Sequence, residues 1–196
     1  MDSRKEFITV VIHGRGGQGA VTASAIVAEA AYLSGNFVDV HAYPSFGAER
    51  RGAPIQAYAK LSRSKKIWDR SQINNPDVII VFDESVLNQD IASSLKGDGI
   101  IIINSDREPD YFVKKYSLGE DVKIIAYDIN RLSIENNLLI EGNPVVNTPI
   151  LGLLSKALPE LEIDNLKKVV KTKMTKELAE KNISLIQQGY DLAKIL

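Results

Sequence analysis

Residues 7–19 read FITVVIHGRGGQG, and this stretch decides the fold. Residues 7–12 are a short apolar run, largely β-branched, which predicts a buried β-strand. Residues 20–33 are rich in alanine and aliphatic residues, which predicts a helix that ends at Gly35. A glycine-rich connection between a strand and a helix is typical of α/β proteins that hold a phosphate at the helix N-terminus.

The chain continues to alternate between strand-like and helix-like segments. Further strands are expected at residues 37–42, 55–61, 78–82, 100–103 and 122–127. The last three are continuous apolar runs, which is typical of parallel strands covered on both faces. Helical segments are expected between the strands, notably around residues 86–95. The sequence therefore predicts an α/β, Rossmann-like fold with a largely parallel sheet and flanking helices.

The last part of the chain, about residues 148–196, is expected to be a helical C-terminal region. Thr148 suits an N-cap, with Pro149 at the first helical position. Two more helices, rich in lysine on their outer faces, are expected to follow. No internal repeat or low-complexity linker interrupts the sequence, so we expect a single domain over residues 1–196.

Composition narrows the classes of function. The 196 residues carry a formal net charge of −1, which favours neither nucleic acid nor an anionic membrane. There is no cysteine, so the chain itself offers no thiolate for an iron–sulfur cluster. His13 and His41 lack the spacing of a zinc site, and no metal site is expected. With no run long enough to span a bilayer and no signal-peptide pattern, we expect a cytoplasmic protein.

The glycine loop is the first candidate binding segment. Its glycines permit a tight turn and a close approach by a ligand, while the following helix offers unpaired N–H groups and a partial positive charge. The candidate ligand-binding residues are Gly14, Arg15, Gly16, Gly17, Gln18 and Gly19. The alternative is a glycine-rich connection that only packs tightly.

The details of the loop fit NAD and ATP poorly. A nicotinamide site usually has an acidic residue at the end of the second strand, where it binds the ribose hydroxyls. Asp39 is at about the right distance along the chain, but it lies in the middle of the expected strand. No Gly-Lys-Ser/Thr sequence follows the glycines, so the loop is not of the Walker type.

Residues 43–54, YPSFGAERRGAP, form the second candidate segment. They follow the second expected strand and would lie at the same sheet edge as the glycine loop. Arg50 and Arg51 can each bind a phosphate or carboxylate through two hydrogen bonds, and Glu49 can orient one of them. A solvent-exposed turn is the alternative, although the flanking glycines and prolines indicate a specified backbone.

Residues 144–152, PVVNTPILG, form the third segment, in which Asn147 and Thr148 precede a helix that can point toward the same ligand. A purely structural cap is the commoner role of such residues. Asp83 and Glu84 follow a strand and either face a ligand or cap the next helix. Trp68 is expected to be a partly buried core residue in preference to an interface anchor.

Three of these segments together resemble the gamma subunit of pyruvate/2-oxoacid:ferredoxin oxidoreductases. They are GRGGQG at residues 14–19, SFGAERRGAP at 45–54 and NTPILG at 147–152, and the NPD at 75–77 is similar too. The resemblance covers about residues 7–158. The doubled arginine before Gly-Ala-Pro resembles the pyruvate type more than the 2-oxoglutarate or indolepyruvate types.

The resemblance implies a division of labour within a larger enzyme. Thiamine diphosphate binds between the alpha and beta subunits, and iron–sulfur clusters lie in the delta and beta subunits. The whole enzyme oxidatively decarboxylates a 2-oxoacid to an acyl-CoA, with acetyl-CoA as the product from pyruvate, and passes electrons to ferredoxin. The gamma chain is expected to cover the active site and help bind coenzyme A, without catalytic residues of its own.

The residues themselves leave two other classes of protein open. One is a stand-alone nucleotide- or NAD-binding enzyme of the Rossmann type, which rests on the glycine fingerprint alone. The other is a purely structural assembly subunit, in which the glycine loop packs against a partner.

Overall fold

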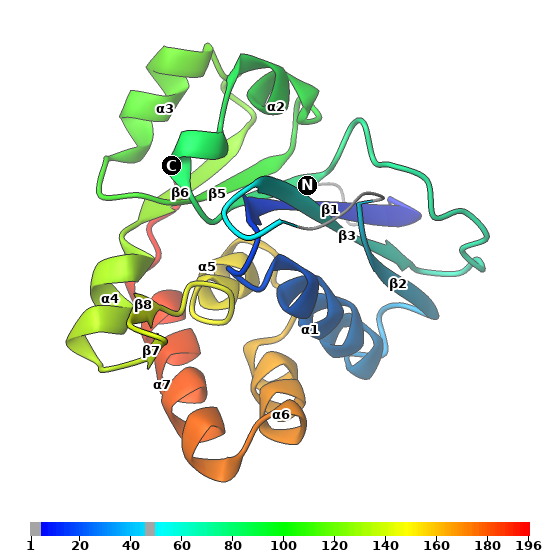
Figure 1. Cartoon of the computed structure of the whole chain (residues 1–196). Coiled ribbons are helices and arrows are strands. Elements are labelled where there is room, and N and C mark those ends of the chain that lie inside the picture. The colour runs from blue at the N-terminus through cyan, green and yellow to red at the C-terminus, as the bar shows by residue number, and fades with distance from the viewer. Residues whose placement is uncertain (1–4, 46–49) are drawn as a thin grey trace.

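A computed structural model describes residues 5–45 and 50–196 of the chain (Figure 1). A six-stranded sheet has the order β2-β3-β1-β4-β5-β6. The strands are β1 (Phe7–Arg15), β2 (Asp39–Pro44), β3 (Pro54–Ser62), β4 (Val78–Val81), β5 (Ile100–Asn104) and β6 (Lys123–Tyr127). The neighbouring pairs β1–β4, β4–β5 and β5–β6 are parallel, whereas β3 runs antiparallel to both of its neighbours, β1 and β2. The predicted α/β fold with a largely parallel sheet is confirmed.

Helices cover both faces of this sheet. They are α1 (Ala20–Leu33), η1 (Glu84–Val86), α2 (Gln89–Ser94), α3 (Pro109–Tyr116), α4 (Ile129–Glu135), α5 (Ile150–Ala157), α6 (Ile163–Lys173) and α7 (Lys176–Leu192). α1 and α5 pack on one face, with α6 and α7 outside them, and α2 and α3 lie on the other face (Figure 1). A small hairpin, β7 (Leu139–Ile140) and β8 (Asn143–Pro144), lies beside α4. The helical C-terminal region is therefore present.

The central strands alternate their side chains between two cores. Val78 and Ile80 of β4 join the larger core beneath α1 and α5, and Ile79 and Val81 join the core beneath α2 and α3. All four side chains are fully buried. Each such burial stabilises the fold by roughly 1.5–3 kcal/mol. Burial on both faces explains why this strand appears in the sequence as an uninterrupted apolar run.

The two predicted helix starts differ in their outcome. α1 spans the residues that the sequence predicts, between Gly19 and Gly35, which both adopt the left-handed conformation. The prediction that Thr148 is an N-cap is wrong, because Pro149 is the N-cap of α5. Thr148 is fully buried, and its hydroxyl donates to Asn182 of α7, since a buried hydroxyl needs a partner.

The strand directions determine which residues share an edge of the sheet. β1, β2, β4, β5 and β6 all run the same way, so their carboxyl ends lie together and the glycine loop follows β1 there. Asp39 and Phe7 both lie opposite Ser62 of β3, so Asp39 is at the amino end. The length of β1, roughly 26 Å at about 3.3 Å per residue, separates Asp39 from the glycine loop.

Residues 63–77 connect β3 to β4 and project beyond the β2 edge of the sheet (Figure 1). Trp68 lies in this connection and is 88% exposed, so the prediction that it is a core residue is wrong. Its neighbour Ile67 is buried instead, and the Ile67 N–H donates to Asp39 Oδ2 at 2.7 Å. Across residues 5–45 and 50–196, no helix combines the length and apolar character that a membrane span requires.

Candidate functional site

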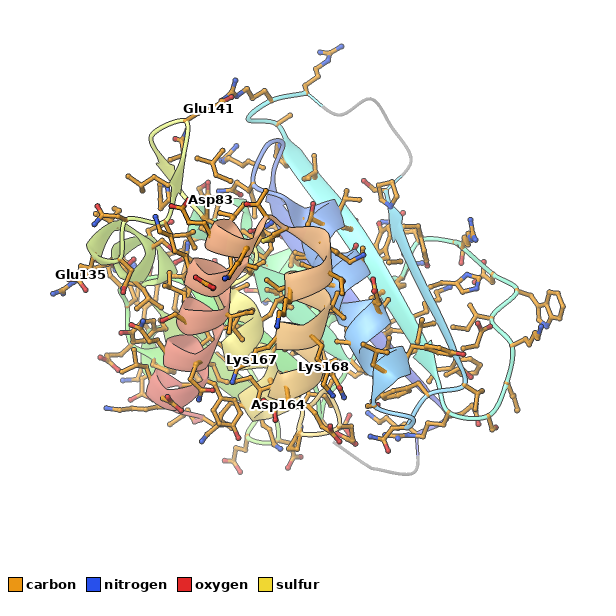
Figure 2. All side chains as sticks on the ribbon, turned by 90° about the horizontal axis from the view of Figure 1, so that it is seen from below. Asp83, Glu135, Glu141, Asp164, Lys167 and Lys168 are labelled. Atoms are coloured by element: carbon orange, nitrogen blue, oxygen red, sulfur yellow. The ribbon has the colours of Figure 1, made fainter. Side chains whose placement is uncertain are left out.

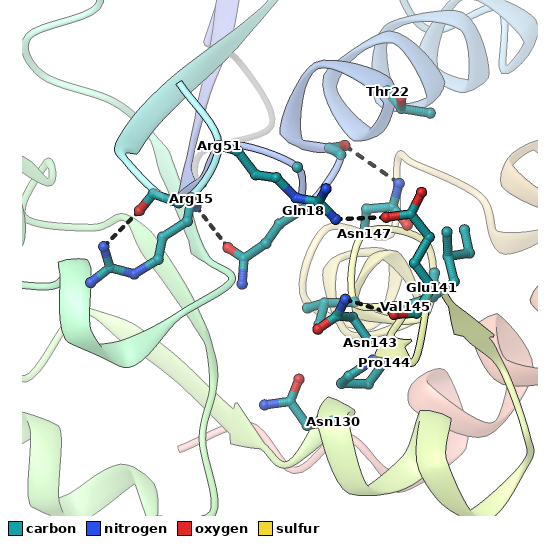
Figure 3. A pocket seen from close by; sticks show the side chains of 16 residues that line it. Arg15, Gln18, Thr22, Arg51, Asn130, Glu141, Asn143, Pro144, Val145 and Asn147 are labelled. Carbon is teal, nitrogen blue, oxygen red and sulfur yellow. Dashed lines mark hydrogen bonds and ion pairs between the residues drawn. The ribbon is translucent and has the colours of Figure 1, made fainter. Parts of the chain in front are cut away.

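The carboxyl edge of the sheet carries a pocket of about 550 Å³ (Figure 3). Three segments that are distant in the sequence form most of its lining: the glycine loop, the chain just before β3, and the chain from β7 to the start of α5. Asn130 of α4 also lines it. Pockets that bind small molecules commonly have volumes of roughly 300–1,000 Å³. The residues that the sequence analysis nominates and that line this pocket are Arg15, Gly16, Gly17, Gln18, Gly19, Arg51 and Asn147.

Gly16 allows two backbone segments to approach each other closely. Its N–H donates to the Ala53 carbonyl at 2.9 Å, and its carbonyl accepts from the Gly52 N–H at 3.0 Å. A β-carbon at Gly16 would overlap the carbonyl oxygen of Arg50. The segment with the two arginines is therefore attached to the glycine loop by backbone hydrogen bonds, and this attachment requires glycine.

Gly19 and Gly17 have opposite surroundings. A β-carbon at Gly19 would overlap the side-chain amide nitrogen of Asn147, so Gly19 makes room for the third segment. Gly17 has φ 96°, and the nearest atom to its β-carbon position would be Arg51 Cγ at 3.9 Å. Gly17 therefore presents accessible backbone to the pocket, while other segments of the chain fill the space beside the α-carbons of Gly16 and Gly19.

Arg15 is held by three hydrogen bonds within the chain. Its guanidinium donates to Asp83 Oδ2 at 2.9 Å, to the Gly52 carbonyl at 3.0 Å and to Ser85 Oγ at 2.6 Å. Burial opposes the ionised form of Asp83, but hydrogen bonds from Ser85 and Arg15 outweigh burial and lower the pKa of that carboxyl. The Asp83 side chain also caps η1. Of the two roles considered for this residue, facing a ligand or capping the next helix, the structure therefore shows the cap.

Gln18 stabilises the turn of the glycine loop. Its side-chain Oε1 accepts a hydrogen bond from the Arg15 backbone N–H at 2.7 Å. The backbone N–H of Gln18 donates to the Arg15 carbonyl at 3.0 Å. Both interactions are internal to the loop, and Figure 3 shows the one made by the Gln18 side chain. The loop thus holds its shape through its own hydrogen bonds.

Arg51 differs from Arg15 because its side chain is 79% exposed. Its Nη2 lies 2.6 Å from Glu141 Oε2, which comes from the tip of the β7–β8 hairpin (Figures 2 and 3). The Glu141 side chain is 69% exposed, so the pair lies in solvent at the pocket. Exposed ion pairs contribute only about 0–1 kcal/mol. An anionic ligand can therefore replace Glu141 beside Arg51 at little cost.

The N-terminus of α1 adds further hydrogen-bond donors. The first N–H groups of a helix have no acceptor within the helix, and they carry a partial positive charge. In α1 no side chain caps them, and the first turn holds no acidic residue. Gly19 and Thr22, at this end of α1, line the pocket. Together with Arg51, these N–H groups suit the pocket to a phosphate or a carboxylate.

Three other nominated residues, Gly14, Arg50 and Thr148, lie outside the pocket lining. Gly14 is beside Gln18 and Phe82, Arg50 is exposed, and Thr148 is fully buried. Glu49 lies outside the described residues. Four further lining residues, Gly52, Pro144, Val145 and Val146, belong to the candidate segments but were not singled out. The lining residues outside every candidate segment are Thr22, Asn130, Ile140, Glu141 and Asn143. The Gly142-Asn143-Pro144 run is a turn signal that indicated a loop there without indicating a ligand.

His13 lies away from this pocket, at the side of β1 that faces Gln56 and Asp90. Burial lowers its pKa to about 4, so the imidazole is neutral at pH 7. Within the part of the chain that the structure describes, no three His, Asp or Glu side chains form a group suited to a metal ion.

The sequence pattern of the pyruvate ferredoxin/flavodoxin oxidoreductase family matches residues 9–192. The chain belongs to this family. A similar protein is the gamma subunit common to the pyruvate and ketoisovalerate oxidoreductases of Pyrococcus furiosus, 38% identical over 96% of this chain and 98% of that one. Another is pyruvate synthase subunit PorC of Methanothermobacter thermautotrophicus, 36% identical over 94% of each chain. The predicted assignment to the gamma subunits is confirmed.

Solved structures agree with this assignment. The pyruvate oxidoreductase subunit PORC of Thermotoga maritima matches with a TM-score of 0.81 and 30% identity, over 97% of this chain and 99% of that chain. A 2-oxoglutarate:ferredoxin oxidoreductase from Magnetococcus marinus, solved with 2-oxoglutarate, coenzyme A and succinyl-CoA bound, shares the fold. Its TM-score is 0.74 at 20% identity, over 96% of this chain and 31% of that chain. A gamma subunit is one chain of several, so this protein has subunit partners and is not itself the catalytic centre.

Proposed function

We propose that this gamma subunit helps bind coenzyme A and covers the active site of a pyruvate:ferredoxin oxidoreductase in the cytoplasm. The assembled enzyme would convert pyruvate and coenzyme A to acetyl-CoA and CO₂ and reduce ferredoxin. Alpha, beta and delta subunits would be its partners. Thiamine diphosphate and iron–sulfur clusters would be bound by those partners, in keeping with the absence of cysteine from this sequence.

One observation carries the proposal: the three segments that resemble the family meet in one pocket at the N-terminus of α1. Coenzyme A is a polyanion through its phosphates, and the pocket offers the matching donors. Gly17 exposes backbone, Arg51 exposes its guanidinium, and the first turn of α1 has uncapped N–H groups. The Magnetococcus marinus enzyme, which shares the fold, was solved with coenzyme A bound.

The roles of the individual residues follow from their contacts. Arg51 would bind phosphate oxygens after Glu141 moves away, and Gly17 would let a phosphate reach the helix N-terminus. Arg15 and Gln18 would act indirectly, because the Arg15 guanidinium and the Gln18 Oε1 already hydrogen-bond within the chain. They would hold the loop in the conformation that the ligand meets.

A purely structural subunit is the second candidate, and the packing at Gly16 and Gly19 favours it. Both glycines accommodate protein segments, which is the packing role that the sequence analysis left open. The stand-alone NAD enzyme has less support, because Asp39 lies at the opposite end of β1 from the glycine loop. From there it cannot bind the ribose of a nucleotide whose phosphates lie at that loop.

The proposal is tested by isolating this chain from its native cells without oxygen and identifying the proteins that accompany it by mass spectrometry. We expect a thiamine diphosphate-binding pair and a ferredoxin-like subunit, with dye reduction that requires both pyruvate and coenzyme A. Replacing Arg51 by alanine should leave the subunit composition unchanged and raise the KM for coenzyme A. A normal KM in the assembled variant would favour the structural subunit, and a chain that purifies alone would refute both.

A further inference from the structure

The most exposed large apolar side chain of the described residues is Trp68, which is also the single tryptophan of the sequence. An indole can bury on the order of 150–250 Å² of surface, and a soluble protein gains nothing by leaving it in water. Val38, which precedes β2 at the same edge of the sheet, is 56% exposed. The β2 edge therefore presents apolar surface at the end of the molecule opposite the pocket.

The connection that carries Trp68 has a specified conformation. At its start, the Glu6 carboxylate accepts hydrogen bonds from Ser62, Ser64 and Lys65. These bonds lower the pKa of Glu6 to about 2, with Ser64 as the largest cause. At the end of the connection, Ile73 packs against a small core of tyrosines on β2 and β3.

The middle of the connection is held just as closely on both sides of Trp68. Before it, Ile67 is buried and its N–H donates to Asp39. After it, Asp69 lies 2.8 Å from Lys60 Nζ and also accepts two hydrogen bonds from Ser71. The backbone at Trp68 is thus held between two anchored neighbours, while its side chain is exposed to solvent. An anchor that is already ordered loses little conformational entropy when it binds, which favours association.

The charges around Trp68 indicate the chemistry of its partner. Lys65, Lys66 and Arg70 are exposed on the same connection. The one carboxylate among residues 63–70, that of Asp69, is paired with Lys60. The Glu6 carboxylate also borders this segment, where it accepts hydrogen bonds from Ser64 and Lys65. The lysines and arginines of residues 63–70 outnumber these two carboxylates. The surface around the indole therefore has a net positive charge, and it complements an apolar pocket with a rim of carboxylates.

We propose that residues 63–70 are a docking surface for another subunit of the oxidoreductase, with Trp68 as its anchor. The partner surface is an apolar pocket that receives the indole, surrounded by acidic side chains that face Lys65, Lys66 and Arg70. Tryptophan is among the residues that contribute most to protein interfaces when they insert into such a pocket. This inference rests on the proposed function only in requiring that the chain works within a multisubunit enzyme.

The first test compares hydroxyl-radical oxidation of Trp68 in the purified full chain and in the assembled enzyme. We expect Trp68 to be oxidised readily in the free chain and to be protected after assembly. Tyr111, which lies on α3 by the opposite edge of the sheet, is the internal reference. Equal oxidation of Trp68 in the two states would overturn the docking surface while leaving the proposed function intact.

The second test identifies the occupant by cross-linking through Lys65 and Lys66 in the assembled enzyme. Cross-links to an acidic peptide of a different subunit are expected. Cross-links that join only two copies of this chain would overturn the inference about the partner. A chain that never associates with other subunits would refute the proposed function as well, so the two failures are distinguishable.

Substitutions measure the contribution of the anchor to assembly. Trp68→Ala should weaken association with the other subunits by about tenfold or more, and Trp68→Phe should retain most of it. Tyr111→Ala, an aromatic truncation at the other edge, should leave association unchanged. If Trp68→Ala associates with the other subunits as tightly as the wild type, the proposal is contradicted. In the complex that still forms, we expect a normal KM for coenzyme A, because docking and ligand binding use different surfaces.

Discussion

The pocket has an inner wall and a rim that differ in how their residues are used. In the inner wall, Gly16, Gly19 and Arg15 already contact protein: two glycines accommodate other segments, and the arginine makes three hydrogen bonds. At the rim, Gly17 has open space and Arg51 is 79% exposed with one solvent-facing partner. A glycine-rich loop thus serves two purposes at once: part of it builds the pocket, and part of it is free to meet a ligand.

The largest effect is expected from Gly16→Ala in the inner wall. The new methyl group would overlap the Arg50 carbonyl oxygen, and backbone cannot move aside as a side chain can. We expect a loss of roughly 2–4 kcal/mol in the free energy of unfolding. Thermal unfolding followed by circular dichroism measures it.

Gly17→Ala is the matched control for this substitution. The added methyl group would meet only Arg51 Cγ, at an ordinary van der Waals distance of 3.9 Å, so the cost of about 1–2 kcal/mol comes from the left-handed backbone at φ 96°. Equal destabilisation by the two alanines would remove the distinction between inner wall and rim.

A smaller loss of stability is expected for Asp83→Asn, which removes the charged partner of Arg15. We expect a loss of about 1.5 kcal/mol at pH 7, at the low end for a hydrogen bond to a charged group because both side chains are partly exposed. Because folding lowers the pKa of Asp83, its contribution exists above the unfolded pKa of about 3.9 and disappears as the pH falls through the folded pKa. Denaturant unfolding of both proteins from pH 7 down to a pH below the folded pKa of Asp83 should give stabilities that converge in acid. A constant difference would contradict this account.

Arg51→Ala at the rim should affect the ligand and spare the fold. We expect the KM for coenzyme A to rise by about tenfold, equivalent to about 1.4 kcal/mol, with kcat and the melting temperature little changed. Steady-state kinetics of the assembled enzyme measure this split. Arg50→Ala is the matched control, because Arg50 is exposed but does not line the pocket. A loss of stability in Arg51→Ala would place this residue with the inner wall.

The smallest effect, and one of opposite sign, is expected from Glu141→Gln. Glu141 competes with an incoming anion for Arg51, so its neutralisation should lower the KM for coenzyme A by about twofold, within the range of an exposed ion pair. The control is Glu135→Gln, since Glu135 also pairs with an arginine but lies outside this pocket. A raised KM in Glu141→Gln would mean that the carboxylate itself helps bind the ligand.

The sequence was sufficient to predict the sheet and the three segments that form the site. β4 and β5 are buried on both faces, and Ile124 and Ile125 in the middle of β6 are buried too, so their apolar runs identify these strands without knowledge of their neighbours. The ends of α1 were equally clear, because Gly19 and Gly35 have backbone conformations that glycine adopts readily. Placement of the loops at one edge followed from the strand directions.

The division of roles within those segments could not be predicted, because it depends on contacts between residues far apart in the chain. Arg15 and Arg51 look equivalent in the sequence, and only the positions of Asp83 and Glu141 distinguish them. Glu141 itself lies in a hairpin with two-residue strands, too short to produce a periodic signal. Trp68 was misplaced for a similar reason: its neighbour Ile67 is the buried residue, and the Ile67 backbone N–H donates to Asp39, which is distant in the sequence.

The central claim is that the rim binds the phosphates of coenzyme A, and one comparison tests it directly. The assembled wild-type enzyme and its Arg51→Ala variant are assayed with coenzyme A and with pantetheine, a thiol acceptor that lacks the phosphates. We expect the substitution to raise the KM for coenzyme A by about tenfold, as for the loss of a charge-assisted phosphate contact, and to leave that for pantetheine unchanged. An equal change for both thiols, or no change for either, would contradict the account.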